Sequence, residues 1–391
     1  MNAAAKKIVF LSLNRFNPVL CDGVSNSMLE LLLFLKGQGH DVSISTVYTH
    51  EEYRQFVFRY LAARRSESGD CPATDAYLAD LKGVEVWQTL VPLGEGAVYG
   101  ESRRFQGLLI RRLQEVHPDV VLTVEDDALS LFAVSLLGIP GAHFFHSWAY
   151  VQAFRNRPVW LSLLKKRRVF AVSAFLREKI RAFLGFQAEV WPPLFDLGPY
   201  ILDRKSDEKK VIGYYSAGPH KGDGVVNRLI LKRPDWKFLV VGRNYTAFFK
   251  EWPSHLDYRG DLTDFREFYG RISVLLVPSL EEEAFPRVIL EAAVNGIPVV
   301  ANRVGGIPEA LGEGGLLVDV DLSRADEAGM LDALADEYQT RIDRLLSDGE
   351  FYALLGQRAL ERAQVYQENQ AQVSKRHYAE LFGVSKDQRI L

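Results

Sequence analysis

The sequence lacks several features that would place it in a specialised class of protein. Its 391 residues contain only two cysteines, Cys21 and Cys71, which by themselves cannot build a disulfide framework or a zinc site. No apolar run approaches the ~20 residues that a membrane-spanning helix needs, and "LLLFL" at 31–35 is far shorter. The formal net charge of −3 gives no positive field that would attract nucleic acid. These absences predict a cytoplasmic protein without a nucleic-acid partner, and they leave open a peripheral contact with the inner face of a membrane.

The composition that remains is that of an ordinary soluble protein, with 48% hydrophobic and 25% charged residues. The length predicts two domains, because single domains usually hold ~100–200 residues. The N-terminal "MNAAAKKIVFLSL" faintly resembles a signal peptide. The polar "NRFN" follows it directly, without a small-residue cleavage site, and therefore favours a first strand.

Strand and helix patterns alternate through the first half of the chain. We expect strands at 8–13, 41–48, 119–124, 141–145 and 169–173, and helices at 25–39, 50–65, 101–116 and 174–184. This alternation predicts a parallel sheet with helices on both faces.

A proline-containing polar stretch at 190–210 interrupts the alternation and is typical of a linker. Strands are then expected at 211–216, 236–242, 272–279 and 297–301, helices at 222–231 and 285–295, and helices alone from about 324. The sequence thus predicts an α/β protein of two Rossmann-like, doubly wound parallel-sheet domains that face a cleft. Ligands of such sheets bind beyond the carboxyl ends of the strands. The predicted domains are 1–192 and 205–365, with a helix at 366–391 that returns to the first domain.

Three features of the first domain are candidates for function. His146 follows the strand at 141–145, where it is placed to bond a hydroxyl or donate a proton near neutral pH, or to serve only as a structural histidine. Asp22 and Gly23 precede a helix start, where a glycine permits close approach and the helix attracts an anion, although an ordinary turn explains them too. The basic run "KKRR" at 165–168 fits contact with anionic lipid or a solvated helix face.

Lys221 and a later glycine pair stand out in the second domain. Lys221 lies beside Gly222 at a helix start, which combines a point charge, bare backbone and a helix dipole and so suits a phosphate. The glycine spacing of a Walker loop is absent. Gly305 and Gly306 precede another short helix, where they favour close backbone approach by an anion or form a simple turn.

The stretch "EEEAFPRVILEAAVNGIPVV" at 281–300 carries two carboxylates, Glu283 and Glu291, eight positions apart. Eight helical residues span about 12 Å, roughly the reach from a sugar ring across a diphosphate to a ribose. Carboxylates at both ends would accept hydrogen bonds from hydroxyls, and the helix N-terminus would face the diphosphate. The alternative is that the acids only favour the helix start and that Glu291 points to solvent.

These residues resemble the retaining glycosyltransferases of family 4, which have the GT-B fold. The resemblance is densest over 256–318, where the family's Glu-x7-Glu motif falls on Glu283 and Glu291. Weaker similarity covers "DGVSNSMLELLLFLKGQGHDVSIST", "HFFHSW" and "HKGDGV". The resemblance implies that Glu291 holds the donor ribose, that Glu283 binds the transferred sugar, and that Lys221 neutralises the leaving diphosphate.

The resemblance also implies contacts from the backbone. N–H groups from Phe285 through Val288, Arg287 included, would hold the diphosphate and sugar, except at Pro286, which has no N–H. Gly23 would pass close to the donor phosphates, and His146 would lie near the sugar and acceptor. No metal or cofactor is expected beyond the nucleoside-diphosphate sugar.

The sequence departs from the family pattern at two positions. Ser216 stands where the family often has an arginine, five residues before the phosphate lysine, and we hypothesise that Arg287 supplies the missing charge. Asp22 stands in place of the first glycine of the family's usual pair. An aspartate near a diphosphate is unfavourable unless it points to the acceptor or bonds the backbone.

The leading hypothesis is therefore a metal-independent enzyme that transfers a sugar from a nucleoside-diphosphate sugar to an acceptor hydroxyl with retention, in bacterial-type glycan or glycoconjugate biosynthesis. One alternative is a nucleotide-sugar epimerase of GT-B fold, which would need no acceptor. Another is a non-catalytic nucleotide-sugar binder. The sequence names neither the donor's base and sugar nor the acceptor, which is a sugar, a lipid-linked glycan or a small molecule.

Overall fold

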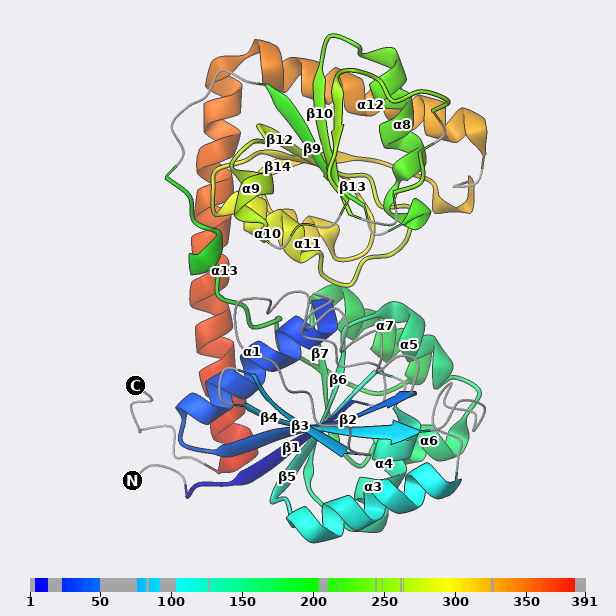
Figure 1. The fold of residues 1–391 in the computed structure, drawn as a ribbon, viewed down its shortest axis with the longest axis vertical. Helices are drawn as coiled ribbons and strands as arrows, with labels where there is room; N and C mark the ends of the chain where they lie inside the picture. Colours follow the sequence, from blue (N-terminus) through cyan, green and yellow to red (C-terminus); the bar gives the residue numbers. More distant parts are fainter. Residues whose placement is uncertain are drawn as a thin grey trace. The chain divides into compact units, whose positions relative to one another are not determined.

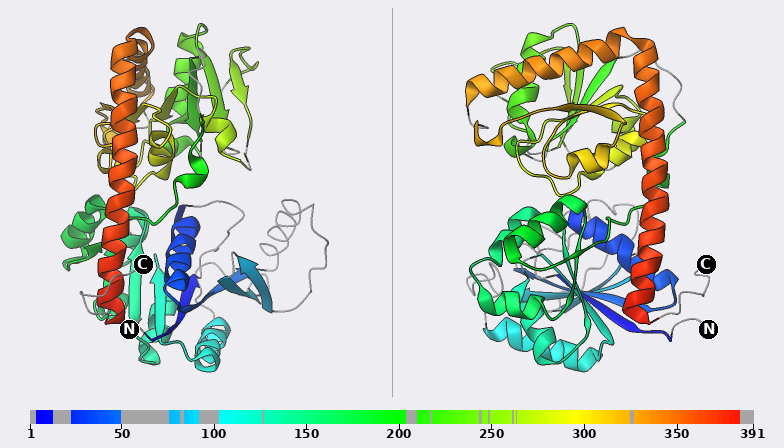
Figure 2. Two further views of the ribbon diagram at one scale, coloured as in Figure 1. Left: turned by 90° about the vertical axis from the view of Figure 1, so that its left-hand side faces the viewer. Right: turned by 180° about the vertical axis from the view of Figure 1, so that it is seen from behind.

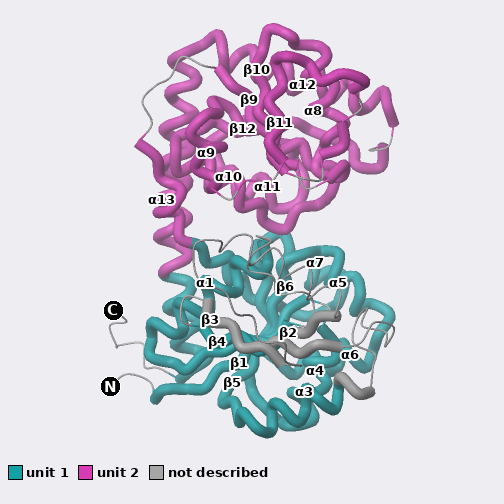
Figure 3. The backbone as a smooth tube through the Cα atoms, viewed as in Figure 1, with its two compact units in different colours: residues 1–195, 372–391 teal, residues 196–371 magenta. Residues whose placement is uncertain are grey.

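The chain forms two compact units, coloured separately in Figure 3: residues 1–195 with 372–391, and residues 196–371. We call them unit 1 and unit 2. The computed structural model describes residues 4–12, 23–49, 76–81, 84–91, 103–125, 127–203, 210–216, 218–242, 245–247, 249–260, 262, 264–324 and 327–383. The helix predicted at 50–65 lies outside these residues.

Unit 1 is built on an eight-stranded sheet of order β3-β4-β2-β1-β5-β6-β7-β8, seen in Figure 1. Its strands are β1 (Lys7–Ser12), β2 (Asp41–Thr49), β3 (Ala76–Leu81), β4 (Val84–Val91), β5 (Val120–Val124), β6 (Gly141–Phe145), β7 (Arg168–Ala171) and β8 (Glu189–Val190). All neighbours pair in parallel except β3, which runs antiparallel to β4 at the edge of the sheet. The sequence analysis did not predict β3 and β4.

Helices cover both faces of this sheet. They are α1 (Gly23–Gly37), α3 (Arg103–Val116), α4 (Ala128–Leu136), α5 (Trp148–Ala153), α6 (Pro158–Leu164) and α7 (Ala174–Leu184). Successive side chains of a strand point to opposite faces. In β1, Ile8 and Phe10 therefore pack in the core layer that α1 covers, whereas Val9 and Leu11 pack in the layer formed with α3 and α4.

Unit 2 repeats this architecture with a six-stranded parallel sheet of order β11-β10-β9-β12-β13-β14. The strands are β9 (Val211–Tyr215), β10 (Lys237–Val241), β11 (Leu256–Tyr258), β12 (Val274–Val277), β13 (Val299–Asn302) and β14 (Gly315–Val318). The helices are α8 (Asp223–Lys232), α9 (Arg266–Tyr269), α10 (Arg287–Ala293), α11 (Ile307–Leu311) and α12 (Ala328–Ser347), with short 3₁₀ turns η1 (Gly198–Tyr200), η2 (Pro219–Lys221) and η3 (Leu322–Arg324). Two Rossmann-like units confirm the predicted fold class, with the antiparallel β3 as a departure.

The last helix, α13 (Gly349–Phe382), contributes residues to both units and is continuous in both views of Figure 2. Within unit 2, the Tyr352 hydroxyl donates to the Ser273 carbonyl at 2.8 Å. Within unit 1, Ser374 accepts a 2.9 Å hydrogen bond from the Trp191 indole, and the Tyr378 hydroxyl lies 3.0 Å from His40 Nε2. Among the described residues, no helix is long and apolar enough to cross a membrane.

Candidate functional site

Lys221 and Glu283 form an ion pair at the carboxyl edge of the unit 2 sheet. Lys221 follows β9 and Glu283 follows β12, so parallel neighbouring strands deliver both residues to the same edge. The Lys221 ammonium donates to Glu283 Oε1 at 2.6 Å and to Glu281 Oε1 at 2.8 Å. The Ser279 hydroxyl donates to the same Glu283 oxygen at 3.0 Å. Two residues that the sequence analysis assigned to one ligand are thus brought into direct contact.

The carboxylates hold Lys221 in its charged form. Burial by itself would lower the pKa of Lys221, but the attraction of Glu283 and the hydrogen bonds to Glu281 and Glu283 outweigh burial and raise that pKa. The side chains of Lys221 and Glu283 are 23% and 17% exposed, so the pair is accessible without being fully solvated. The site therefore holds a protonated Lys221, paired with two carboxylates, at the position where a phosphate is expected.

Glycines let the loops of this site lie directly against one another. Gly222 has φ +100°, and a Cβ there would lie 2.2 Å from the Pro278 carbonyl oxygen. The Gly306 N–H donates to the Glu283 carbonyl at 2.6 Å, and a Cβ on Gly306 would lie 2.1 Å from the Ala284 oxygen. The backbone that carries Glu283 thus lies directly against Gly305 and Gly306, and approach of an anion to these glycines stays a prediction.

Glu291 lies inside unit 2, on the buried face of α10. It is 7% exposed, its Oε2 accepts a 2.7 Å hydrogen bond from the Tyr269 hydroxyl, and its Oε1 lies 3.7 Å from Arg287 Nε. Burial raises the pKa of Glu291, opposed by the attraction of Arg287 and by hydrogen bonds from Tyr269 and Tyr200. The alternative that Glu291 points to solvent is wrong.

The helix expected at 285–295 is present as α10, which runs from Arg287 to Ala293. Pro286 is the N-cap residue of the helix and Arg287 its first residue. The Phe285 ring stacks on Tyr366 of α13 with centroids 5.2 Å apart, which anchors the turn before the helix. Val288 is partly buried beside it. The contacts of these backbone N–H groups with a donor, and the role of Arg287 as a replacement charge, stay predictions.

Ser216 is part of an internal network that the sequence analysis missed. It is 1% exposed, and its hydroxyl donates to Asp223 Oδ1 at 2.7 Å. The Tyr214 hydroxyl donates to the same oxygen at 2.7 Å, and the Thr246 N–H donates to Asp223 Oδ2 at 2.7 Å. The position of the missing arginine therefore faces a buried carboxylate. The only signal for Asp223 in the sequence is its place at the start of a predicted helix.

In unit 1, His146 lies at the carboxyl end of β6 beside the buried Glu125. The His146 backbone N–H donates to Glu125 Oε1 at 2.9 Å, and the His146 Nδ1 lies 3.7 Å from the same oxygen. Burial lowers the pKa of His146 to about 3, which favours the neutral imidazole near neutral pH. Of the roles expected for His146, hydrogen bonding to a hydroxyl therefore fits this environment better than donation of a proton. The neutral ring can still exchange hydrogen bonds with a hydroxyl.

Glu125 was missed, although it directly follows the predicted strand at 119–124. It is 2% exposed and has φ +57°, a left-handed conformation that is uncommon outside glycine and is often found at functional sites. His143, one pleat before His146, is fully buried, and its Nδ1 lies 2.9 Å from the Thr123 hydroxyl. That contact explains His143 as structural.

Gly23 opens α1 and is exposed, and its carbonyl accepts a 2.6 Å hydrogen bond from the Ser27 hydroxyl. Among the described residues, no heavy atom would lie within 4 Å of a Cβ at this position. Asp22 lies outside the described residues.

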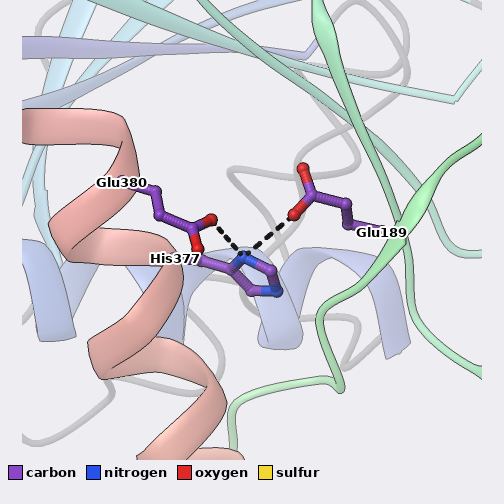
Figure 4. Close-up of side chains that lie close together, drawn as sticks. All are labelled: Glu189, His377 and Glu380. Carbon is purple, nitrogen blue, oxygen red and sulfur yellow. Dashed lines mark hydrogen bonds and ion pairs between the residues drawn. The ribbon is translucent and has the colours of Figure 1, made fainter.

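One cluster has the composition of a metal site: Glu189, His377 and Glu380, shown in Figure 4. Their ligand atoms lie within 4.8 Å of one another, the one such group among the described residues. Arg168 Nη2 lies 2.6 Å from an oxygen of each glutamate, so a guanidinium already supplies the positive charge. His377 Nε2 lies 3.0 Å from the Val190 carbonyl. We interpret the cluster as an ion-pair network that fastens α13 to β7 and β8.

Comparison with known proteins places the chain in a family. The sequence model described as "Glycosyltransferase Family 4" matches residues 21–198, and the one described as "Glycosyl transferases group 1" matches residues 225–339. The chain belongs to glycosyltransferase family 4. Within the second match lie both members of the Glu-x7-Glu pair, Glu283 and Glu291.

Solved structures show that this family member has the GT-B fold. Sucrose-phosphate synthase from Thermosynechococcus elongatus superimposes with a TM-score of 0.70 at 18% identity, covering 97% of this chain and 100% of that one. Anabaena HepE, solved with UDP and glucose, superimposes with a TM-score of 0.69 at 16% identity over 96% of this chain and 99% of that one.

Curated relatives match over a shorter stretch. D-inositol 3-phosphate glycosyltransferase of Corynebacterium efficiens is 42% identical over 97 residues, 24% of this chain and 20% of that protein. N-acetyl-alpha-D-glucosaminyl L-malate synthase of Bacillus anthracis is 35% identical over 99 residues, 25% of this chain and 22% of that protein. The matched stretch therefore spans about a fifth of the length of these relatives.

Proposed function

We propose that the protein transfers a glycosyl group from a nucleoside-diphosphate sugar to an acceptor hydroxyl, with retention of anomeric configuration. The observation that carries the proposal is the Lys221–Glu283 pair, 2.6 Å apart at the carboxyl edge of the unit 2 sheet, just before α10 and its buried Glu291. Membership of glycosyltransferase family 4 supports it. The HepE structures solved with UDP or UDP-glucose support a nucleotide-sugar donor.

Lys221 is the group that we assign to the leaving diphosphate. The bond between the anomeric carbon and the phosphate oxygen breaks with its electron pair on the diphosphate, and a fixed cation there stabilises the transition state. An entering phosphate would compete with Glu281 and Glu283 for the ammonium. Glu283 would then be available to accept hydrogen bonds from the hydroxyls of the sugar.

The remaining parts of the site orient the reactants. Glu291 would accept a hydrogen bond from the donor ribose, and the N–H groups at 285, 287 and 288 would bind the diphosphate. An acceptor oxygen held on the face that the diphosphate leaves forms the new bond and passes its proton to the departing phosphate oxygen, which gives retention. For His146, which belongs to unit 1, we propose separately that its neutral ring exchanges a hydrogen bond with a hydroxyl.

We further propose that Lys221 and the backbone N–H groups make a bound metal unnecessary, and that the product belongs to glycan or glycoconjugate biosynthesis. Turnover that persists after EDTA treatment is the expected result. Loss of turnover that Mg²⁺ or Mn²⁺ restores would contradict metal independence.

The test is a panel of nucleoside-diphosphate sugars and acceptor hydroxyls, read by release of nucleoside diphosphate and by NMR of the anomeric proton of the product. Lys221→Met should abolish most turnover, whereas Lys232→Met, on the exposed side of α8, should not. Appearance of an epimer without any acceptor would favour an epimerase. Donor binding without turnover across the panel would favour a binding protein.

A further inference from the structure

The large exposed apolar side chains of unit 1 gather on two neighbouring helices. Among the described residues of this unit they are Phe132 (41% exposed) and Leu136 (61%) on α4, and Val159 (65%) on α6. Helices α4 and α6 pack against each other (Figure 1). Phe132 and Leu136 are four residues apart and so project from the same face of α4. Single exposed apolar residues are normal, but a group on adjoining helices indicates a contact surface.

The same segment is rich in basic side chains, of which Arg168 and Arg177 are paired with carboxylates from outside it. Although the chain as a whole has a net charge of −3, residues 128–177 contain seven Lys or Arg and no Asp or Glu. Arg155 and Arg157 precede α6, Lys165 and Lys166 follow it, and all four are exposed. The segment itself therefore supplies no carboxylate to neutralise the cations at the two ends of α6.

Within the basic run at 165–168, the two arginines bind other parts of the fold, whereas the two lysines are exposed. Arg167 donates to the carbonyls of Ile139 and Val121 at 3.2 and 2.8 Å, and Arg168 donates to Glu189 and Glu380 at 2.6 Å. These two arginines hold the fold together. Lys165 and Lys166 are exposed and directly follow α6, the helix that carries Val159.

We propose that α4, α6 and the basic residues at both ends of α6 dock unit 1 on a bilayer that contains anionic lipid. Apolar side chains flanked by lysine and arginine suit the boundary between headgroups and acyl chains, and the cations are drawn to the negative surface. Trp160 of α6, partly buried under Arg157 with 3.9 Å between guanidinium and ring, has the amphipathic character of residues at this boundary. The proposal rests on this surface alone and does not depend on the proposed glycosyl transfer.

The surface favours a bilayer over a nucleic acid because it pairs its cations with exposed apolar side chains. Phosphate contacts alone would account for the lysines and arginines, but they leave Phe132, Leu136 and Val159 without a function. A bilayer uses both kinds of side chain at once. Binding should therefore require the apolar residues as well as the charges.

The experiment is co-sedimentation of the purified full-length chain with vesicles of phosphatidylcholine, with or without about one third phosphatidylglycerol. We expect binding to the anionic vesicles only, weakened by added salt. Lys165→Gln with Lys166→Gln should lower the partition coefficient by about ten- to thirty-fold. Each basic residue near an anionic surface contributes about 1 kcal/mol of binding free energy, and about 1.4 kcal/mol corresponds to a tenfold change. Phe132→Ser with Leu136→Ser should lower it to a similar degree.

Matched controls change the same residue types elsewhere on the surface. Lys237→Gln with Lys250→Gln, and Leu231→Ser with Val365→Ser, replace exposed residues of unit 2 and should leave vesicle binding unchanged. Thermal unfolding of every variant checks that the fold is intact.

Several results would overturn the proposal. They are absence of vesicle binding by the parent chain, equal binding to uncharged vesicles, and equal losses in the control variants. If the chain binds a polyanion such as RNA, and the double variant Phe132→Ser with Leu136→Ser binds it equally well, the surface is one that binds nucleic-acid phosphates instead. A dimer that dissociates in sedimentation velocity when these two residues are changed would identify a second copy of the chain as the occupant.

Discussion

Replacement of Glu291 by glutamine tests whether this buried carboxylate serves donor binding or only the stability of the fold. Burial raises the pKa of Glu291, so the folded state holds the protonated acid more readily than the unfolded chain does. Ionisation of Glu291 therefore lowers the free energy of unfolding. This loss is absent below the ordinary pKa of glutamate and grows as the pH rises from there through the raised pKa of the folded state. Glu291→Gln removes the charge but keeps an oxygen that can accept from the Tyr269 hydroxyl, now 2.7 Å away.

The variant should be more stable than the parent at pH 7 and should bind the donor less well. A hydrogen bond to a charged group contributes about 1.5–3 kcal/mol, which corresponds to roughly ten- to hundred-fold in affinity. Because the amide still accepts one hydrogen bond, we expect about tenfold for Glu291→Gln and about a hundredfold for Glu291→Ala.

Calorimetric titration with nucleoside diphosphates and nucleotide sugars measures the affinity, and thermal unfolding between pH 4 and pH 8 measures stability. The gain in stability should shrink as the pH falls into the glutamate range. Glu361→Gln, an exposed position on α13, serves as the matched control and should change neither quantity. The reasoning is refuted if Glu291→Gln is less stable than the parent at pH 7 and binds nucleotides equally well.

Three further predictions address Lys221, Gly306 and His146. Lys221→Met should lower kcat/KM by about 10²–10³ in a nucleotide-release assay, and a loss below threefold would remove Lys221 from the mechanism. Gly306→Ala forces a Cβ to 2.1 Å from the Ala284 oxygen. It should lower the free energy of unfolding, measured with urea, by about 1–3 kcal/mol and should reduce turnover. An unchanged unfolding free energy and turnover would show that the turn at Glu283 moves freely. Burial lowers the pKa of His146 to about 3, so only the unfolded chain takes up its proton as the pH falls through about 6.5. His146→Gln should therefore lose less stability than the parent between pH 7 and pH 5, and an equal loss would contradict a neutral His146.

Local signals predicted the elements whose ends are defined by their own residues. The expected helix at 174–184 matches α7, because the Ser173 hydroxyl accepts the Leu176 N–H at its start and Gly185, at φ +72°, ends it. The strand at 141–145 matches β6, in which the four residues from Ala142 to Phe145 are buried. β3 and β14 escaped prediction, because these short edge strands are defined by pairing with β4 and β13 and carry little pattern of their own.

The site was predictable in its residue types but not in its contacts. Parallel strands bring Lys221 and Glu283 to one edge, yet their direct ion pair joins residues 62 positions apart, which no local pattern encodes. Burial of Glu291 depends on Tyr269, 22 positions away, and so the sequence alone left its direction open. The partner of Ser216 was invisible for a different reason, since comparison with a family pattern reveals a lost arginine but not what the replacing hydroxyl binds.

The division of α13 between the two units has a consequence for anyone who builds chimeras with a relative. A fragment cut after residue 195 would lack Ser374 and Tyr378, and would leave the Trp191 indole and His40 without the hydrogen bonds that these residues provide. A graft of unit 2 from a relative therefore needs two splice points, near 195 and near 372. The tail beyond the second splice must come from the same parent as the N-terminal half.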